Sequence, residues 1–153
     1  MQLTSSRMSD KELKNKLDVI LSTLQVYYNN IHALHWSVKA PDFISLHNYL
    51  DELYECTGTH IDMIAEFARI YNMHPINTLK GYLSKSLIQE ISVAQSQDRT
   101  KGLAKMIADT TVMNKVSVDC FKKTEAYPDI NDYAAVMVAD FGKRIWFMKS
   151  MEK

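Results

Sequence analysis

The sequence predicts an all-α protein: a bundle of four long helices, with a short helix in the long connection between the second and the third. Four stretches carry apolar residues at helical spacing. The composition agrees, because 46% of the 153 residues are apolar and only 4 Gly and 3 Pro interrupt them. Residues 1–8 are interpreted as a polar N-terminal arm and residues 9–153 as a single domain, which is the size of one substantial core.

The first helix is expected to begin at a capping box, in which Ser9 is followed three residues later by Glu12. It ends near Trp36, because residues 38–41 lead into a proline that disfavours helix in the residue before it. Its apolar face consists of Leu13, Leu17, Ile20, Leu21, Leu24, Tyr28 and Ile31. Asp42 is a candidate N-cap for the second helix, which runs to about Tyr71.

The pattern then weakens to two short pieces, Thr78 to Leu83 and Ser86 to about Val93, which predict one or two short helices in the crossover. A third long helix is expected over roughly Asp98 to Glu125, and Asp129 is expected to cap the fourth. The short link between the first two helices makes them antiparallel neighbours, and the long link after the second resembles the connection in ferritin-like bundles.

The charge balance excludes some function classes. Eighteen basic residues match eighteen acidic ones, so no overall field attracts the chain to nucleic acid or membrane.

Cys56 and Cys120 are far apart and form no CxxC, which suits reduced thiols. No stretch is long and apolar enough to span a bilayer, and we expect a cytoplasmic protein without a membrane partner.

One stripe on the second helix concentrates metal-ligand side chains. His47, Asp51, Asp62 and Glu66 are separated by 4, 11 and 4 residues, which places them at about 0°, 40°, 60° and 100° around a helix. His47 and Asp62 are nevertheless roughly 22 Å apart along the axis. One metal ion cannot bind both within a single chain.

Two interpretations remain. In the first, the stripe is a solvated face and His47 has no special role. In the second, an antiparallel copy related by a two-fold axis brings His47 of one subunit opposite Asp62 of another. The axis would then pass near residues 56–58, whose small side chains would allow two backbones to approach closely.

A conventional di-iron bundle carries Glu-x-x-His pairs that point into its own core. No Glu-x-x-His occurs in this sequence. The ligands, if they bind metal, must therefore converge outside the core of one bundle.

The positions of these residues resemble the ferroxidase motif of the Dps mini-ferritins, the DNA-binding proteins from starved cells. The resemblance lies in His35-Trp36 and in the complete spacing of the ligand-type residues that follow. It extends to Lys39, Phe43 and Leu46, to Ile64-Ala65-Glu66, to Pro75 and Thr78, and to Ile145-Trp146, and so covers nearly the whole chain.

The resemblance implies a homododecameric shell with iron sites at two-fold subunit interfaces. His35 and His47 of one subunit would face Asp62 and Glu66 of the next, and Asp51 would assist a weaker second iron position. Each site would bind two Fe(II), oxidise them with hydrogen peroxide in preference to oxygen, and deliver ferric mineral to the interior, which protects against oxidative damage. Imidazole and carboxylate ligands suit both iron oxidation states.

The resemblance also places Trp36 close to the iron, where its indole could supply electrons, although an ordinary interface or core aromatic explains it equally well. His60 and His74 receive no role and are interpreted as structural or surface residues. Two departures from the family pattern are Phe67 after Glu66 and Asn72-Met73 where Gly is usual.

DNA binding is the family's other activity and defines the alternative function, a nucleoid-compacting protein with secondary metal binding. It commonly depends on a lysine-rich terminal arm that contacts phosphates. Here the arm is short, and Lys11, Lys14 and Lys16 are expected to belong to the first helix. Strong DNA binding is therefore not expected.

Overall fold

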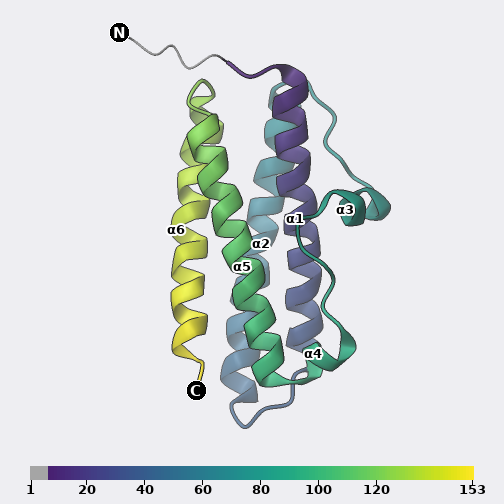
Figure 1. Ribbon diagram of the computed structural model, residues 1–153, viewed down its shortest axis with the longest axis vertical. Helices are drawn as coiled ribbons and strands as arrows, with labels where there is room; N and C mark the ends of the chain where they lie inside the picture. The colour runs from purple at the N-terminus through teal and green to yellow at the C-terminus, as the bar shows by residue number, and fades with distance from the viewer. Residues whose placement is uncertain (1–6) are drawn as a thin grey trace.

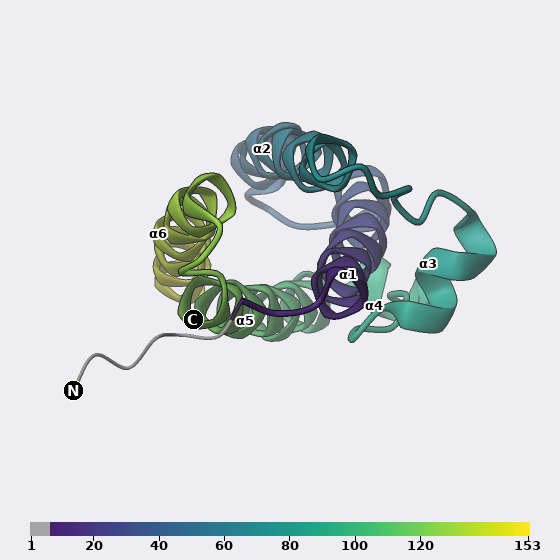
Figure 2. The ribbon, with the colours of Figure 1, turned by 90° about the horizontal axis from the view of Figure 1, so that it is seen from above.

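The computed structural model describes residues 7–153 and is all-helical, with no strand in that range. Four long helices form an antiparallel bundle, and two short helices lie outside it against α1 (Figures 1 and 2). The helices are α1 (Asp10–Ser37), α2 (Phe43–Ile70), α3 (Leu79–Lys85), α4 (Val93–Gln97), α5 (Arg99–Lys123) and α6 (Pro128–Ser150). This confirms the predicted fold class. Residues 1–6 of the predicted polar arm lie outside the described range, and the division at residue 8 stays a prediction.

The first helix begins as the sequence predicts. The Glu12 N–H donates to the Ser9 hydroxyl at 3.1 Å, and the Ser9 N–H donates to the Glu12 carboxylate at 2.8 Å. The apolar stripe of α1 is buried against α2 and α5, with Leu17, Leu24 and Ile31 at most 1% exposed. Burying each of these side chains contributes about 1.5–3 kcal/mol, so packing rather than helix propensity holds α1 in the bundle.

One predicted cap is confirmed only as a position, and the other is wrong. Asp42 occupies the N-cap position of α2 but makes no capping bond, because its carboxylate accepts two bonds of 2.8 Å from the Arg99 guanidinium. The N-cap of α6 is Tyr127, since Pro128 takes the first helical position that its fixed φ favours. The Asp129 carboxylate instead accepts a 2.6 Å bond from the Tyr71 hydroxyl.

The crossover contains two short helices, but the second begins at Val93 and not at Ser86, so the predicted helix over Ser86 to Val93 is wrong. The stretch before Val93 is irregular because its backbone bonds to side chains of α1. The Leu87 N–H donates to the Thr23 hydroxyl at 3.1 Å, and the Ile91 N–H donates to the side-chain oxygen Oδ1 of Asn30 at 2.8 Å.

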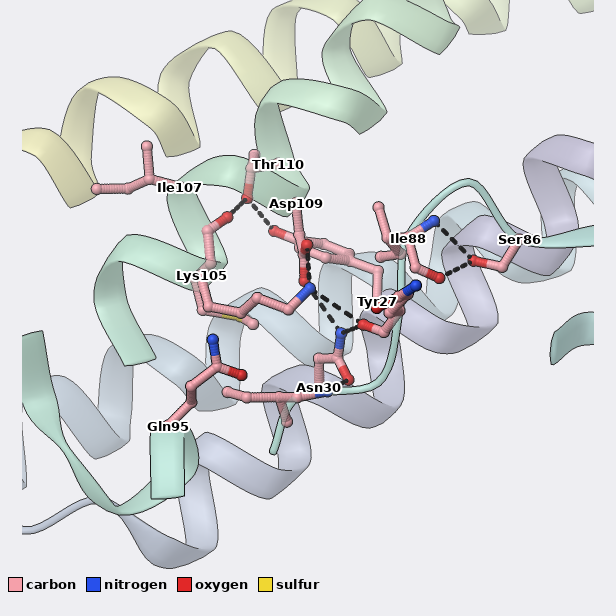
Figure 3. A network of polar contacts seen from close by, with 12 residues as sticks. Tyr27, Asn30, Ser86, Ile88, Gln95, Lys105, Ile107, Asp109 and Thr110 are labelled. Carbon is pink, nitrogen blue, oxygen red and sulfur yellow. Dashed lines mark hydrogen bonds and ion pairs between the residues drawn. The ribbon is translucent and has the colours of Figure 1, made fainter. Parts of the chain in front are cut away.

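Asn30 is the centre of the polar network that attaches the crossover to the bundle (Figure 3). Its amide nitrogen donates to the Gln89 carbonyl at 2.9 Å and to the Asp109 carboxylate at 3.0 Å. Lys105 donates to the same two groups. Burial raises the pKa of Asp109, although Lys105 and Asn30 oppose the shift. The network joins α1, the crossover and α5.

The end of α2 explains the departure at Asn72-Met73. Asn72 has a left-handed φ of 59°, which Asn adopts more readily than other non-glycine residues. The Met73 N–H donates to the Ala68 carbonyl at 2.7 Å, and the Asn72 N–H donates to the Arg69 carbonyl at 3.0 Å. These two bonds make a Schellman motif, so asparagine replaces the glycine that usually ends such a helix.

Candidate metal centre

The short link between α1 and α2 brings His35, in the last turn of α1, against His47, in the second turn of α2. The two rings are stacked, with centroids 3.7 Å apart and planes inclined by 17°. The Nδ1 of His35 lies 3.1 Å from the His47 carbonyl, and the Nδ1 of His47 lies 3.0 Å from the His35 carbonyl. Because a carbonyl only accepts, each Nδ1 donates its proton to a carbonyl, so Nε2 is the nitrogen of each ring that is positioned to bind metal.

Asp51 lies one turn after His47 on α2 and completes a group of three. Its carboxylate lies 3.4 Å from the Nε2 of His35, and one ligand atom from each of the three residues lies within 4.8 Å of the others. His35 is buried, whereas His47 and Asp51 are partly exposed. Two imidazoles and a carboxylate with an open side are a donor set suited to Fe(II).

Asp62 and Glu66 lie farther along α2 and are both exposed. Among residues 7–153, the groups of three or more metal-ligand side chains do not include either of them. The chain thus presents one half of the predicted ligand set at each end of the stripe, as the axial spacing requires.

Two of the three small side chains at the middle of α2 do not face outward, contrary to the expectation for a close approach of two backbones there. Thr57 is buried, and its hydroxyl donates to the Leu53 carbonyl. The Cys56 thiol donates to Asp140 of α6 at 3.3 Å. Both side chains point into the bundle of their own chain, so they cannot be what lets a second backbone approach.

A row of aromatic rings leads from the histidine pair to Trp36. The Tyr54 ring lies 5.5 Å from His35 and 4.3 Å from His32, and His32 stacks on Trp36 at 5.1 Å. The Trp36 side chain is 73% exposed, so it is not a core aromatic of this chain. Its position suits either an interface residue or an indole close to the metal.

A second group of ligand side chains lies inside the bundle, where sequence reasoning assigned nothing. Cys56 and His60 of α2 meet Asp140 of α6, again with ligand atoms within 4.8 Å of one another. Burial lowers the pKa of His60, but its bonds to Asp140 and Cys56 outweigh burial and raise that pKa to about 9. The four-residue spacing of Cys56 and His60 puts them on one helix face, a signal that was present in the sequence. His74, by contrast, is exposed.

Comparison with known proteins agrees with the helical bundle described above. The family model described as "Ferritin-like domain" matches residues 14–151. The chain is 35% identical over 89 residues to "DNA protection during starvation protein 2" of Bacillus anthracis, and 33% identical over 97 residues to an uncharacterised protein of Haemophilus influenzae. These matches cover 58% and 63% of the chain, and the chain spans 61% of the length of each relative.

Among solved structures, Dps of Vibrio cholerae O1, described as a member of a broad superfamily of ferritin-like diiron-carboxylate proteins, has a TM-score of 0.87. The two chains are 22% identical, over 94% of this chain and 91% of that one, which shows a shared fold. Because the family model matches residues 14–151, this chain belongs to the ferritin-like family. The similar proteins include Dps proteins, which confirms the resemblance to the Dps family that the sequence around His35 and His47 indicates.

Within residues 7–153, no helix combines the length and the apolarity needed to cross a lipid bilayer.

Proposed function

We propose that this protein stores and detoxifies iron by oxidising Fe(II) at sites shared between subunits. The observation that carries the proposal is the division of the ligands. One chain brings together His35, His47 and Asp51, while Asp62 and Glu66 are exposed farther along α2. The distance along the helix axis from His47 to Asp62 is roughly 22 Å.

A two-fold axis through the middle of α2 would bring the two halves together. In an isologous interface each residue of one subunit meets the residue at the mirrored position of its partner. An antiparallel pair of α2 helices therefore forms two equal sites, each with histidines from one chain and Asp62 and Glu66 from the other. The exposed Trp36 lies beside the histidine half of each site.

The ligands have separate tasks in this account. The Nε2 atoms of His35 and His47 bind the first Fe(II) together with the partner's carboxylates, and Asp51 assists a second iron nearby. Two Fe(II) and two protons reduce one hydrogen peroxide to two waters and yield two Fe(III). Delivering both electrons together avoids the hydroxyl radical that one-electron reduction would release. Carboxylates then retain the hard Fe(III) product.

Further features of the proposal come from the resemblance to Dps proteins. They are the closed shell of twelve subunits built on two-fold dimers, the ferric mineral stored in its interior, the preference for peroxide over oxygen, and the cytoplasmic location. Protection against oxidative damage would follow from removing Fe(II) and peroxide in the same reaction.

Stopped-flow mixing tests the proposal. Anaerobic protein loaded with Fe(II) is mixed with peroxide, and the native chain is compared with Asp62→Ala at equal assembly size. We expect the native protein to oxidise about two Fe(II) per peroxide, as a paired site requires, and Asp62→Ala to lose this rapid phase. Glu125→Ala, which removes an exposed carboxylate from the loop before α6, serves as the matched control. Equal rates in native protein and Asp62→Ala would refute a catalytic role for the stripe.

The alternative function, compaction of DNA, receives little support from the lysines of α1. Lys14 pairs with Asp18, and Lys16 with Asp119, at 2.5 Å and 2.7 Å. We infer that DNA binding is weak and disappears at moderate salt. Retention of duplex DNA at physiological salt would favour the alternative.

A further inference from the structure

The Cys56, His60 and Asp140 group differs in kind from the iron ligands described above. On the helical wheel of α2, Cys56 and His60 lie at about 180° and 220° from His47. Their bonds to Tyr133 and Asp140 show that they face α6, which lies beside α2 in the bundle (Figure 2). All three ligands come from a single chain and need no partner subunit.

The ligand atoms converge on one point. The Asp140 Oδ2 lies 2.8 Å from the His60 Nε2 and 3.3 Å from the Cys56 Sγ, and that Sγ lies 3.8 Å from the same Nε2. A tetrahedral Zn²⁺ with bonds of about 2.3 Å to sulfur and about 2.05 Å to nitrogen and oxygen separates its ligands by about 3.3–3.6 Å. The present triangle matches those separations after shifts of about half an ångström or less.

The atoms that would not bind the ion have partners of their own. The His60 Nδ1 lies 2.7 Å from the Tyr133 hydroxyl, which fixes the ring with its Nε2 toward the group. The Arg144 guanidinium donates to the Asp140 Oδ1 at 3.3 Å, which leaves Oδ2 for the ion. Such outer bonds orient ligands at known metal sites and select the imidazole tautomer.

Charge also permits a cation here. Both the Cys56 thiol and the His60 Nε2 direct a proton at the Asp140 Oδ2. A divalent ion that replaces these two protons leaves the total charge of the group unchanged. The His60 side chain is 4% exposed and that of Asp140 is 18% exposed. The ion would therefore enter from the side of Cys56 and Asp140, where water can supply a fourth ligand.

We propose that Cys56, His60 and Asp140 form a second metal site, which binds Zn²⁺ or a similar transition ion and joins α2 to α6 within one subunit. Thiolate and imidazole favour such ions over Mg²⁺ or Ca²⁺. The site is independent of the proposed iron oxidation, because it shares no ligand with it.

Cobalt is the probe that separates this site from the iron ligands. Co²⁺ bound to a thiolate gives a near-ultraviolet charge-transfer band, which histidine and carboxylate ligands cannot produce. We expect native protein titrated anaerobically with Co²⁺ to develop this band at one equivalent per chain, and added Zn²⁺ to abolish it. His47→Ala, which disables the iron half-site, is expected to keep the band.

The two cysteines supply the matched control. Cys56→Ser is expected to lose the band, whereas Cys120→Ser, which changes the buried thiol of α5, is expected to keep it. Asp140→Asn tests the third ligand with little change of volume and is expected to weaken Co²⁺ affinity at least tenfold.

A measurement on the native chain needs no variant. Zn²⁺ is expected to protect Cys56 from alkylation by iodoacetamide, as mapped by mass spectrometry. Absence of the band from native protein, its loss in Cys120→Ser with retention in Cys56→Ser, or equal alkylation of Cys56 with and without Zn²⁺ would each overturn the proposal.

Discussion

Replacing Gly102 with alanine is expected to destabilise the protein, although alanine is the better helix former. Gly102 is buried in the first turn of α5, next to Leu34 of α1 and Gln95 of α4. A Cβ there would lie 2.3 Å from the Leu34 Cδ1 and 2.9 Å from the Gln95 carbonyl oxygen. Leu34 is fully buried and the carbonyl belongs to the backbone, so neither can move away cheaply.

The magnitude follows from two opposing effects. Overpacking a core costs about 1–3 kcal/mol, and replacing glycine in a helix gains about 1 kcal/mol. With two close contacts, the net loss at position 102 is about 1–2 kcal/mol. Gly142 of α6 is the matched control, because its nearest neighbour is the Asn114 side chain at 3.9 Å. Gly142→Ala is therefore expected to gain about 0.5–1 kcal/mol.

Denaturant unfolding of both variants at one protein concentration measures the difference, since assembly makes apparent stability depend on concentration. Leu34 precedes His35, so Gly102→Ala is also expected to slow iron oxidation. If Gly102→Ala and Gly142→Ala stabilise the protein equally, the close packing of α5 on α1 and α4 is incorrect.

Two further predictions concern the polar contacts that hold the crossover and the first loop. Asn30→Ala leaves the Ile91 N–H without a partner and the Asp109 carboxylate with Lys105 alone, and it is expected to cost about 1–3 kcal/mol in unfolding free energy. Asn29→Ala, at an exposed neighbour, is expected to change it by less than about 0.5 kcal/mol, and equal effects would contradict the network. Hydrogen bonding from Arg99 lowers the pKa of Asp42. The pair therefore stabilises the protein at pH values above the unfolded-state pKa of about 4. This stabilisation is lost as the pH falls through the lower pKa of the folded state. Because the pair is partly exposed, Asp42→Asn is expected to cost less than about 1 kcal/mol at neutral pH and less still in acid; a cost that does not depend on pH would count against the ion pair.

The long helices could be predicted because their signals are local. The capping box at Ser9 and the apolar spacing after it lie within a few turns of sequence, and the structure reproduces that helix to its end at Ser37. The capping bond expected from Asp42 and the cap expected at Asp129 are absent because each carboxylate bonds to a partner far away in the chain. Arg99 is 57 residues from Asp42, and Tyr71 is 58 residues from Asp129.

The difference between local signals and contacts distant in the chain also applies to the two sites. The resemblance to the Dps motif assigns His35, His47 and Asp51 to one half of the site, and the structure places them together because a short link joins their helices. His60 was assigned no role because its partners Tyr133 and Asp140 are 73 and 80 residues away on α6. Helical spacing shows that Cys56 and His60 share a face, but only the packed bundle shows which carboxylate meets them.

Mixing two inactive variants tests most directly whether each iron site is shared between chains. One variant carries His35→Ala and His47→Ala, and the other carries Asp62→Ala and Glu66→Ala. Each is expected to be inactive when assembled alone, because every site then lacks one half of its ligands. The two are dissociated, combined in equal amounts and reassembled, and rapid iron oxidation by peroxide is measured.

In a random mixture, half of the two-fold pairs contain one chain of each kind, and each such pair has one intact site out of two. Sites shared between two chains therefore predict recovery of about one quarter of the native rapid phase. No recovery in assemblies shown to contain both chains would contradict it, because sites built within single chains cannot be restored by mixing.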